Sequence, residues 1–253
     1  MNREINWDRL SKANYFDRDE LFLAMKSVEP DLTESNFKAR LQKLLQSEEI
    51  GRVGRNAYCV CKKNLRLYSH EYSELANNLA AFIRKKHEYL DFRIFELVQL
   101  NEFLNHQIAH NIIFLSIEAD LQDFVFEELN EKYERKVFID PTLELFHRYM
   151  TDDMIVIGKL PSEAPKGRTE FWHTDLEKLL VDTMNDEIIG STFDKAELQT
   201  VFENAFENYI VDESRLFRYA RRRSVEREMR TFIKEKTDVM LRLGQKNDHK
   251  GKL

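Results

Sequence analysis

The sequence of 253 residues contains few glycines, prolines and cysteines and no long apolar run. Seven glycines and four prolines argue against a turn-rich all-β fold and leave little material for a glycine-rich phosphate loop, so we expect many helices. No apolar stretch approaches the roughly 20 residues of a membrane-spanning helix, and the start of the chain lacks the apolar core of a secretory signal. We therefore expect a cytoplasmic protein with no membrane partner.

Metal-binding patterns are equally scarce. Cys59 and Cys61 are the only cysteines, which excludes a disulfide framework and again favours the cytoplasm. Two thiols supply at most half of a structural zinc site. His106 and His110 are four residues apart but lack the glutamate of the zinc-protease motif. We therefore predict no metal and no cofactor.

The composition is that of a folded protein, with 42% apolar residues, 18 Phe and 9 Tyr, and the length suits one or two domains. Its charge is unevenly distributed. Residues 33–66 contain eight Lys or Arg and three acidic residues, a net charge of +5 within a chain whose net charge is −6. Such a local excess of positive charge indicates an anion-binding surface rather than general adhesiveness.

Apolar spacing predicts helices over 3–14, 18–28 and 34–47, the last with Thr33 as its N-cap. Two short strands, 50–53 and 57–60, flank a tip that contains Gly and Asn, which is typical of a hairpin. Three helices followed by a hairpin predict a winged helix-turn-helix over residues 1–66, with its third helix suited to the major groove of DNA.

Polar residues opposite the apolar face of the third helix, together with the hairpin tip, form the candidate DNA-binding surface. Asn and Arg can read adenine and guanine edges, and Lys and Arg can contact phosphates. The same pattern also fits a winged-helix module that binds protein instead of DNA. The candidate residues are Ser35, Asn36, Lys38, Arg40, Lys43, Arg52, Arg55 and Asn56.

The rest of the chain has a different sequence pattern. We expect a linker helix within 67–90, then an α/β domain over 91–243 with helices at its end, and a frayed tail over 244–253. Strand-like runs at 92–98, 111–117, 136–139 and 154–158 alternate with helical segments, which predicts a sheet with helices packed on it. The fold class predicted for the whole chain is therefore mixed α/β.

Two helix starts in this domain have recognisable signals. Asp140 and Pro141 resemble the N-cap and first residue of a helix over 142–150. Thr174 and Glu177 have the spacing of a capping box that opens a helix over 174–186.

Catalytic motifs are not recognisable. Glu96, Glu118 and Asp140 follow or end strands, as in a nuclease cluster, but no E-x-K pattern accompanies them, so solvated strand ends explain them better. We expect a protein that is not an enzyme. An enzyme that acts on nucleotides or nucleic acid through the α/β domain stays open as the alternative.

A second basic segment, 215–230, has seven Arg and two Glu and again a net charge of +5. Because Arg binds phosphate and carboxylate alike, this segment fits a phosphate contact, internal ion pairs or a docking surface for an acidic protein equally well. The residues concerned are Arg215, Arg218, Arg221, Arg222 and Arg223.

Three stretches resemble the AbiEi family, the antitoxins of type IV toxin–antitoxin systems, in an uncharacterised bacterial branch. They are GRVGRNAY at 51–58, LPSEAP at 160–165 with LEKLLVD at 176–182, and SRLFRYARRR at 214–223. The family's wing tip usually reads Arg-Gly-x-Tyr, and Asn56 replaces that glycine here. Asn also adopts the left-handed conformation that the tip requires.

This resemblance implies an N-terminal winged helix that binds the protein's own promoter and represses its operon. It also implies a C-terminal domain that counteracts a nucleotidyltransferase-type toxin encoded next to it, without a stable complex between the two proteins. Atypical kinase activity is proposed for some relatives, but no phosphate loop in this sequence supports it.

Overall fold

The computed structural model describes residues 5–10, 16–60, 65–239 and 241, and has a mixed α/β fold. The chain forms two compact units: unit 1 comprises residues 1–68 and 206–215, and unit 2 comprises 69–205 and 216–253. Among the described residues, no helix combines the length and the apolarity needed to cross a bilayer. The predictions for Cys61 and for the tail over 244–253 lie outside the described residues.

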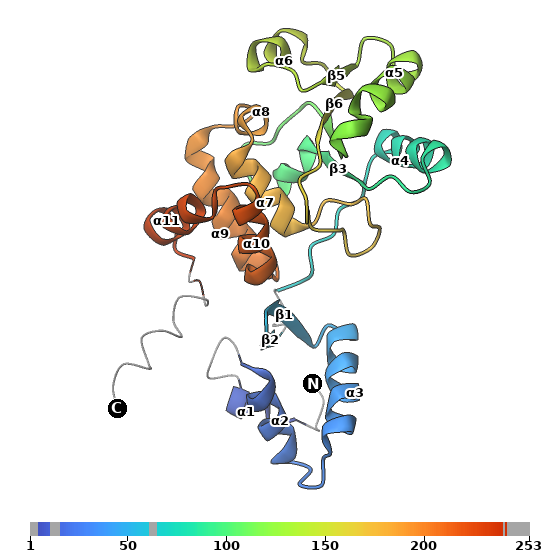
Figure 1. Ribbon diagram of the computed structural model, residues 1–253. Coiled ribbons are helices and arrows are strands. Elements are labelled where there is room, and N and C mark those ends of the chain that lie inside the picture. The colour runs from blue at the N-terminus through green and yellow to red at the C-terminus, as the bar shows by residue number, and fades with distance from the viewer. Residues whose placement is uncertain (1–4, 11–15, 61–64, 240, 242–253) are drawn as a thin grey trace. The chain divides into compact units, whose positions relative to one another are not determined.

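Unit 1 contains α1 (Trp7–Leu10), α2 (Arg18–Lys26), α3 (Glu34–Gln46), β1 (Ile50–Gly54) and β2 (Ala57–Val60), drawn in blue in Figure 1. Thr33 caps α3 as predicted, since its hydroxyl accepts a hydrogen bond from the backbone N–H of Asn36. Asp17 and Glu20 form a capping box at the start of α2. The helix expected over 3–14 is described only as α1, because residues 1–4 and 11–15 lie outside the described part of the chain.

The core of unit 1 follows the helical spacing of its apolar residues. Phe37, Leu41 and Leu44 of α3 are buried against Leu21 and Met25 of α2. Each such side chain contributes about 1.5–3 kcal/mol on burial. Strands β1 and β2 pair antiparallel, and the structure confirms the left-handed conformation of Asn56 at the tip, with φ of 57°. The polar face of α3 is therefore held outward by a packed apolar face.

Residues 206–215 return to unit 1 and complete it. The Ile210 side chain lies directly over Gly51, where a Cβ atom would come within 2.4 Å of it. Ile210 also packs with Val53 and Cys59 of the hairpin, and its backbone N–H donates to the carbonyl of Arg66 at 3.0 Å. One face of the hairpin is thus covered by a segment that is about 150 residues distant in sequence.

Unit 2 is built on a four-stranded sheet in the order β3–β4–β6–β5. The strands are β3 (Phe92–Glu96), β4 (Ile112–Ile117), β5 (Val137–Ile139) and β6 (Met154–Lys159), and all four predicted strands are confirmed. Strands β4, β5 and β6 are parallel, and β3 pairs antiparallel with β4. Strand β4 is almost wholly buried, as its continuous apolar run indicates for a central strand.

Helices cover both faces of this sheet (Figure 1). Helix α4 (Glu74–Lys86) and helix α5 (Gln122–Lys132), which follows the 3-10 turn Ala119–Leu121, share a core with Ile94, Leu115 and Ile157 on one face. The segment expected to be a linker helix is α4, and it packs on the sheet. On the other face lie α6 (Leu143–Tyr149), α7 (Leu176–Asn185) and α8 (Glu187–Gly190). The remaining described elements are two 3-10 turns, Leu97–Glu102 and Lys195–Glu197, and three helices. These helices are α9 (Leu198–Asn208), α10 (Glu213–Arg222) and α11 (Glu226–Lys236).

Two predicted helix starts are wrong by one or two residues. Thr142 caps α6 through a hydrogen bond from the backbone N–H of Leu145, whereas Asp140 has a left-handed backbone with φ of 38° and lies outside the helix. Asp175 caps α7, because the Thr174 hydroxyl donates instead to the carbonyl of Ile94 at 2.8 Å. In both places a neighbouring side chain with the right geometry satisfies the exposed backbone N–H groups.

Candidate functional site

The outer face of α3 presents polar side chains to solvent. Ser35, Asn36, Lys38 and Lys43 are all exposed, while Phe37 and Leu41 between them are buried. This separation follows from the helical repeat, since apolar residues at i, i+4 and i+7 turn toward the core and leave the opposite face free. Lys38 and Lys43 therefore lie as exposed positive charges on a capped helix.

Arg40 has a different environment from its neighbours on α3. Its guanidinium Nη1 lies 2.7 Å from a carboxylate oxygen of Glu29, and 27% of its side chain is exposed. The ion pair neutralises the charge that the sequence suggests for this position. Arg40 is thus placed on the predicted helix but turned toward the loop that joins α2 and α3.

The hairpin tip carries the other candidate residues. Arg52 and Arg55 are exposed, and Arg52 Nε donates to the Gly54 carbonyl at 3.3 Å. The Asn56 side-chain oxygen accepts from the backbone N–H of Arg18 at 3.2 Å, which ties the tip to the first turn of α2. The backbone N–H of Arg55 donates to the Ser214 hydroxyl at 3.0 Å. These contacts fix the backbone of the tip and leave its two arginine side chains outward.

All eight predicted residues thus lie on α3 and the hairpin of unit 1, and four of them are exposed cations, while Arg40 is turned toward Glu29. Two further residues, Arg18 and Ser214, support them and are not marked by the sequence pattern. Arg18 forms an ion pair with Glu34 at 2.6 Å beside the start of α3, and Ser214 holds the hairpin tip from the returning segment. No local sequence pattern links either of them to the hairpin.

The arginines of the second basic segment are mostly engaged by acids. Arg221 pairs with Glu226 at 2.7 Å, Arg222 with Glu163, and Arg223 approaches Asp182 at 3.6 Å. The Arg222 hydrogen bond holds the pKa of the Glu163 carboxyl below its ordinary value. Arg218 is exposed, and Arg215 belongs to unit 1. For Arg221 and Arg222, internal ion pairing is therefore the interpretation that the structure favours.

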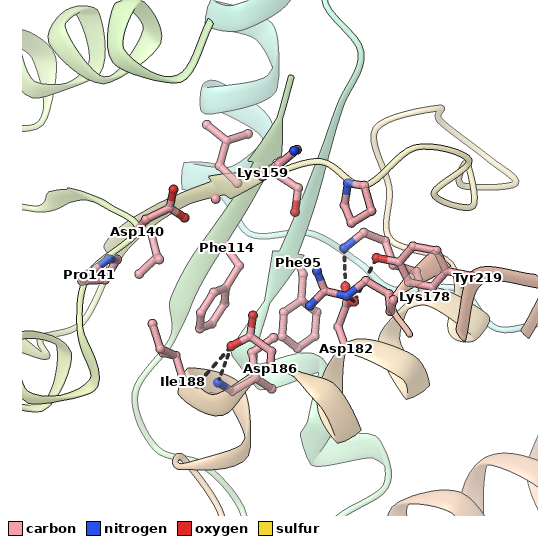
Figure 2. A pocket seen from close by; sticks show the side chains of 17 residues that line it. Phe95, Phe114, Asp140, Pro141, Lys159, Lys178, Asp182, Asp186, Ile188 and Tyr219 are labelled. Carbon is pink, nitrogen blue, oxygen red and sulfur yellow. Dashed lines mark hydrogen bonds and ion pairs between the residues drawn. The ribbon is translucent and has the colours of Figure 1, made fainter. Parts of the chain in front are cut away.

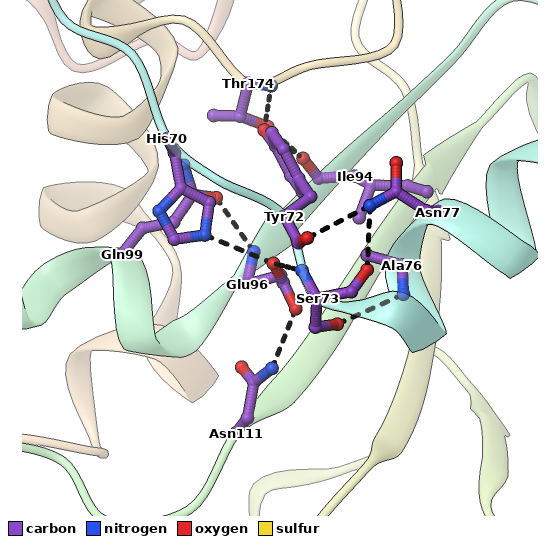
Figure 3. A network of polar contacts seen from close by, with 10 residues as sticks. All are labelled: His70, Tyr72, Ser73, Ala76, Asn77, Ile94, Glu96, Gln99, Asn111 and Thr174. Atoms are coloured by element: carbon purple, nitrogen blue, oxygen red, sulfur yellow. Dashed lines mark hydrogen bonds and ion pairs between the residues drawn. The ribbon is translucent and has the colours of Figure 1, made fainter.

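The three carboxylates considered for a nuclease do not meet. Because β3 runs antiparallel to β4, Glu96 lies beside Ile113 at the start of β4, whereas Glu118 and Asp140 follow the ends of β4 and β5. Glu96 is fully buried and accepts hydrogen bonds from His70 at 3.1 Å, the Ser73 backbone at 2.9 Å and Asn111 at 2.8 Å (Figure 3). Burial alone would raise the pKa of Glu96, but these donors outweigh it and lower that pKa. Glu96 therefore acts as a structural anion that anchors the start of α4.

The two histidines of the H-x-x-x-H pattern also have separate partners. His106 hydrogen-bonds Glu197, and His110 Nδ1 lies 2.9 Å from Asp152. Within the described ranges, no group of three or more His, Cys, Asp or Glu side chains is arranged to hold a metal ion.

Comparison with known proteins places the chain in a family. The model of a family of unknown function, DUF6577, matches residues 36–239. The chain belongs to this family. The match in this DUF6577 protein begins in the first turn of α3 and includes the hairpin and the sheet of unit 2, whereas α1 and α2 precede it.

No curated protein matches the chain significantly. Among solved structures, that of the Rv2827c protein from Mycobacterium tuberculosis aligns with 83% of this chain and 67% of that chain, at 10% identity and a TM-score of 0.31. A TM-score this low supports no inference about the fold or function of the DUF6577 protein.

Proposed function

We propose that unit 1 is a winged helix-turn-helix that binds double-stranded DNA, with α3 in the major groove and the β1–β2 hairpin as its wing. One observation carries this proposal. α3 and the hairpin belong to one unit, and each has one face buried in its core. Their exposed sides carry four cations, Lys38, Lys43, Arg52 and Arg55. Lys and Arg held on a rigid scaffold are the residues that contact DNA phosphates.

The residues at the start of α3 have the chemistry to read bases. Ser35 and Asn36 are exposed in the first turn of the helix, which is the end of a recognition helix that meets base edges. Asn pairs with adenine through two hydrogen bonds, and Ser can donate to or accept from several base edges. The cations of the hairpin and of the later turns of α3 would then contact the phosphates of the DNA backbone and fix the position of the protein along the duplex.

The test is a titration of the promoter fragment of this gene by fluorescence anisotropy at several salt concentrations. Replacing Lys38, Lys43 and Arg55 together by Ala should weaken binding, and the slope of log affinity against log salt should shrink by about 0.9 for each lost phosphate contact. The control is Lys85→Ala, because Lys85 is an exposed lysine of α4 in unit 2. A triple variant that binds with unchanged affinity and slope would contradict the proposal.

Base reading is tested separately with Asn36→Ala. This variant should lose discrimination between the promoter and a scrambled duplex while its salt slope stays the same, because a base contact adds specificity without neutralising phosphate. Equal loss on both duplexes would argue that Asn36 contacts only the backbone.

We further propose that the protein is a repressor of its own operon and an antitoxin of the type IV class, and that it has no catalytic role. The support for this part is the resemblance to the AbiEi family in the segments 51–58, 160–165, 176–182 and 214–223. The test is co-expression with a neighbouring nucleotidyltransferase-like gene, in which this chain should restore growth. A metal-dependent nuclease or nucleotide-transfer activity that Glu118→Ala abolishes would overturn the proposal in favour of an enzyme.

A further inference from the structure

Unit 2 contains a cleft of about 210 Å³ beside the carboxyl ends of its parallel strands (Figure 2). Its floor is the face of the sheet that carries Phe95, Phe114 and Val156, and its walls come from α7, α8 and α10. In open α/β sheets, ligands bind beyond the carboxyl ends of the strands, where the connecting loops diverge. The position of the cleft thus matches the general location of ligand sites in this class of sheet.

Small residues at the carboxyl ends of β4 and β6 leave space for this cleft. Residues on the cleft side of β4 change from Phe114 to Ser116, and those of β6 change from Val156 to Gly158. Ser116 and Gly158 are paired in register, so both small residues lie side by side at the carboxyl end. Large side chains at this pair would fill the space between the sheet and α7. The hollow therefore results from two small residues in adjacent strands.

A buried ammonium group lies in the wall of the cleft. Lys178 of α7 is 2% exposed and its Nζ lies 2.5 Å from a carboxylate oxygen of Asp182, one helical turn later. An ammonium has three N–H donors, and Asp182 is the acceptor that the described residues offer to it. Burying an ammonium with unsatisfied donors is costly. The remaining N–H donors of Lys178 would therefore be satisfied by an acceptor atom of a ligand in the cleft.

Asp182 is shared by several donors. Besides Lys178, it accepts from the Tyr219 hydroxyl at 2.9 Å, and Arg223 Nε lies 3.6 Å away. Tyr219 is 1% exposed, and burial raises its pKa, so it stays a neutral donor to Asp182. Asp182 thus needs no further partner, whereas Lys178 donates only one of its three N–H groups to an acceptor among the described residues. This end of the cleft therefore has N–H donors of Lys178 that are left without an acceptor in the described part of the chain.

The other acidic groups of the cleft are a helix cap and an exposed residue at the opening. Asp186 caps α8 through hydrogen bonds from the backbone N–H groups of Ile188 and Ile189, and burial raises its pKa, which disfavours its charged form. Asp140 is exposed at one side of the opening, and Lys159 is exposed at another. The buried end therefore presents the ammonium of Lys178 and the guanidinium of Arg223, and the floor beside it is aromatic.

We infer that this cleft binds a small organic anion, either a carboxylate or a phosphate monoester. Its oxygens accept hydrogen bonds from Lys178 and Arg223, and its flat or apolar body lies against Phe95 and Phe114. The volume of about 210 Å³ is smaller than the roughly 300–1,000 Å³ typical of drug-sized ligands, so the ligand is a compact metabolite rather than a dinucleotide. This inference is independent of DNA binding by unit 1.

The experiment is a titration of the full chain, labelled in its isoleucine methyl groups, followed by NMR. Ile188 and Ile189 line the cleft, whereas Ile83 lies in the core on the opposite face of the sheet and Ile50 lies in unit 1. The probes are benzoate, phenyl phosphate, inorganic phosphate and the uncharged benzamide. We expect saturable shifts of Ile188 and Ile189 with at least one of the two aromatic anions, and binding of benzamide weaker by about tenfold or more.

Two variants test the contacts. Arg223→Gln should weaken anion binding by about tenfold, because charge-assisted hydrogen bonds are among the strongest polar contacts. The matched control is Arg218→Gln in α10, the helix that ends just before Arg223, since Arg218 is exposed and does not line the cleft. Unshifted signals of Ile50 and Ile83 would show that each variant is folded.

The space itself is tested by filling it. A Cβ atom on Gly158 would meet only Asp140 Oδ1 at 3.6 Å, an ordinary contact, so Gly158→Ala should fold normally and Gly158→Val should occlude the cleft. We expect graded loss of binding from glycine to alanine to valine. The inference is overturned if neither benzoate nor phenyl phosphate shifts Ile188 and Ile189, if benzamide binds as well as the anions, or if Gly158→Val and Arg223→Gln bind like the wild type. Preference for benzoate or for phenyl phosphate decides between carboxylate and phosphate.

Discussion

Two segments with the same net charge of +5, residues 33–66 and 215–230, have different surroundings in the folded protein. Around α3 and the hairpin, Lys38, Lys43, Arg52 and Arg55 are exposed. Around α10, by contrast, Arg221, Arg222 and Arg223 each lie within ion-pair distance of an acid, two of those acids coming from outside the segment. Charge counted along a sequence therefore does not tell whether that charge is available, because the neutralising acids can come from distant segments.

The largest expected effect is on the free energy of unfolding, which should depend strongly on a buried ion pair and little on an exposed lysine. Asp182→Asn leaves the volume of the side chain unchanged but removes the counter-charge of the buried Lys178. Breaking a buried pair in this way costs about 3–5 kcal/mol, so the free energy of unfolding of unit 2 should fall by that order. Lys43→Ala on the exposed face of α3 should change stability by no more than about 0.5 kcal/mol.

Urea denaturation can follow each unit separately, because the two tryptophans are divided between them. Trp7 is buried in unit 1 and Trp172 in unit 2, so the variants Trp172→Phe and Trp7→Phe leave one fluorescent reporter in each unit. If Asp182→Asn left the Trp172 transition unchanged, the buried pair would not be a stabilising feature and the contrast between the two segments would lose its energetic basis.

The elements that carry this contrast differ in how far the sequence predicts them. The apolar repeat of α3, its cap at Thr33 and the hairpin with Asn56 at its tip depend on neighbours within a few residues, and they are predicted correctly. The strands of unit 2 are likewise predicted from their apolar runs. Local sequence patterns contain the information for such elements, because their hydrogen bonds and packing are set by nearby residues.

Long-range partners are not predicted. Glu29 lies only eleven residues before Arg40, yet no periodic pattern marks the pair. The contact of Ile210 with Gly51 and the convergence of Tyr219 and Arg223 on Asp182 depend on the path of the chain in three dimensions. The Lys178–Asp182 pair at i, i+4 has a local signal, since both charges interrupt the apolar run of α7, but exposure of that helix face would explain the same pattern.

The second expected effect is on DNA affinity, and it comes from a substitution that frees a paired cation of α3. Glu29→Gln removes the carboxylate that holds Arg40, so Arg40 should become available to phosphate and DNA affinity should rise several-fold at low salt. The salt slope should increase by up to about 0.9. In the wild-type background, Arg40→Ala should change affinity less than Lys43→Ala, because Arg40 is already neutralised. An equal loss in the two alanine variants would show that Arg40 leaves Glu29 when DNA binds.

The smallest expected effect concerns the acid partners around α10. Hydrogen bonds from Arg221 and Arg230 lower the pKa of the Glu226 carboxyl below its ordinary value of 4.5. A carboxyl with a lowered pKa stabilises the folded state above its unfolded pKa, and that contribution disappears as the pH falls through the folded pKa. Carbon-detected NMR titration should therefore find Glu226 titrating below 4.5, and Arg221→Gln should raise its pKa, whereas Arg218→Gln should not. Because Glu226 is partly exposed, salt should weaken the shift. An unshifted Glu226 would mean that Arg221 is as free in solution as the lysines of α3, and the difference between the two basic segments would then rest on the Arg222–Glu163 pair and on the partners of Asp182.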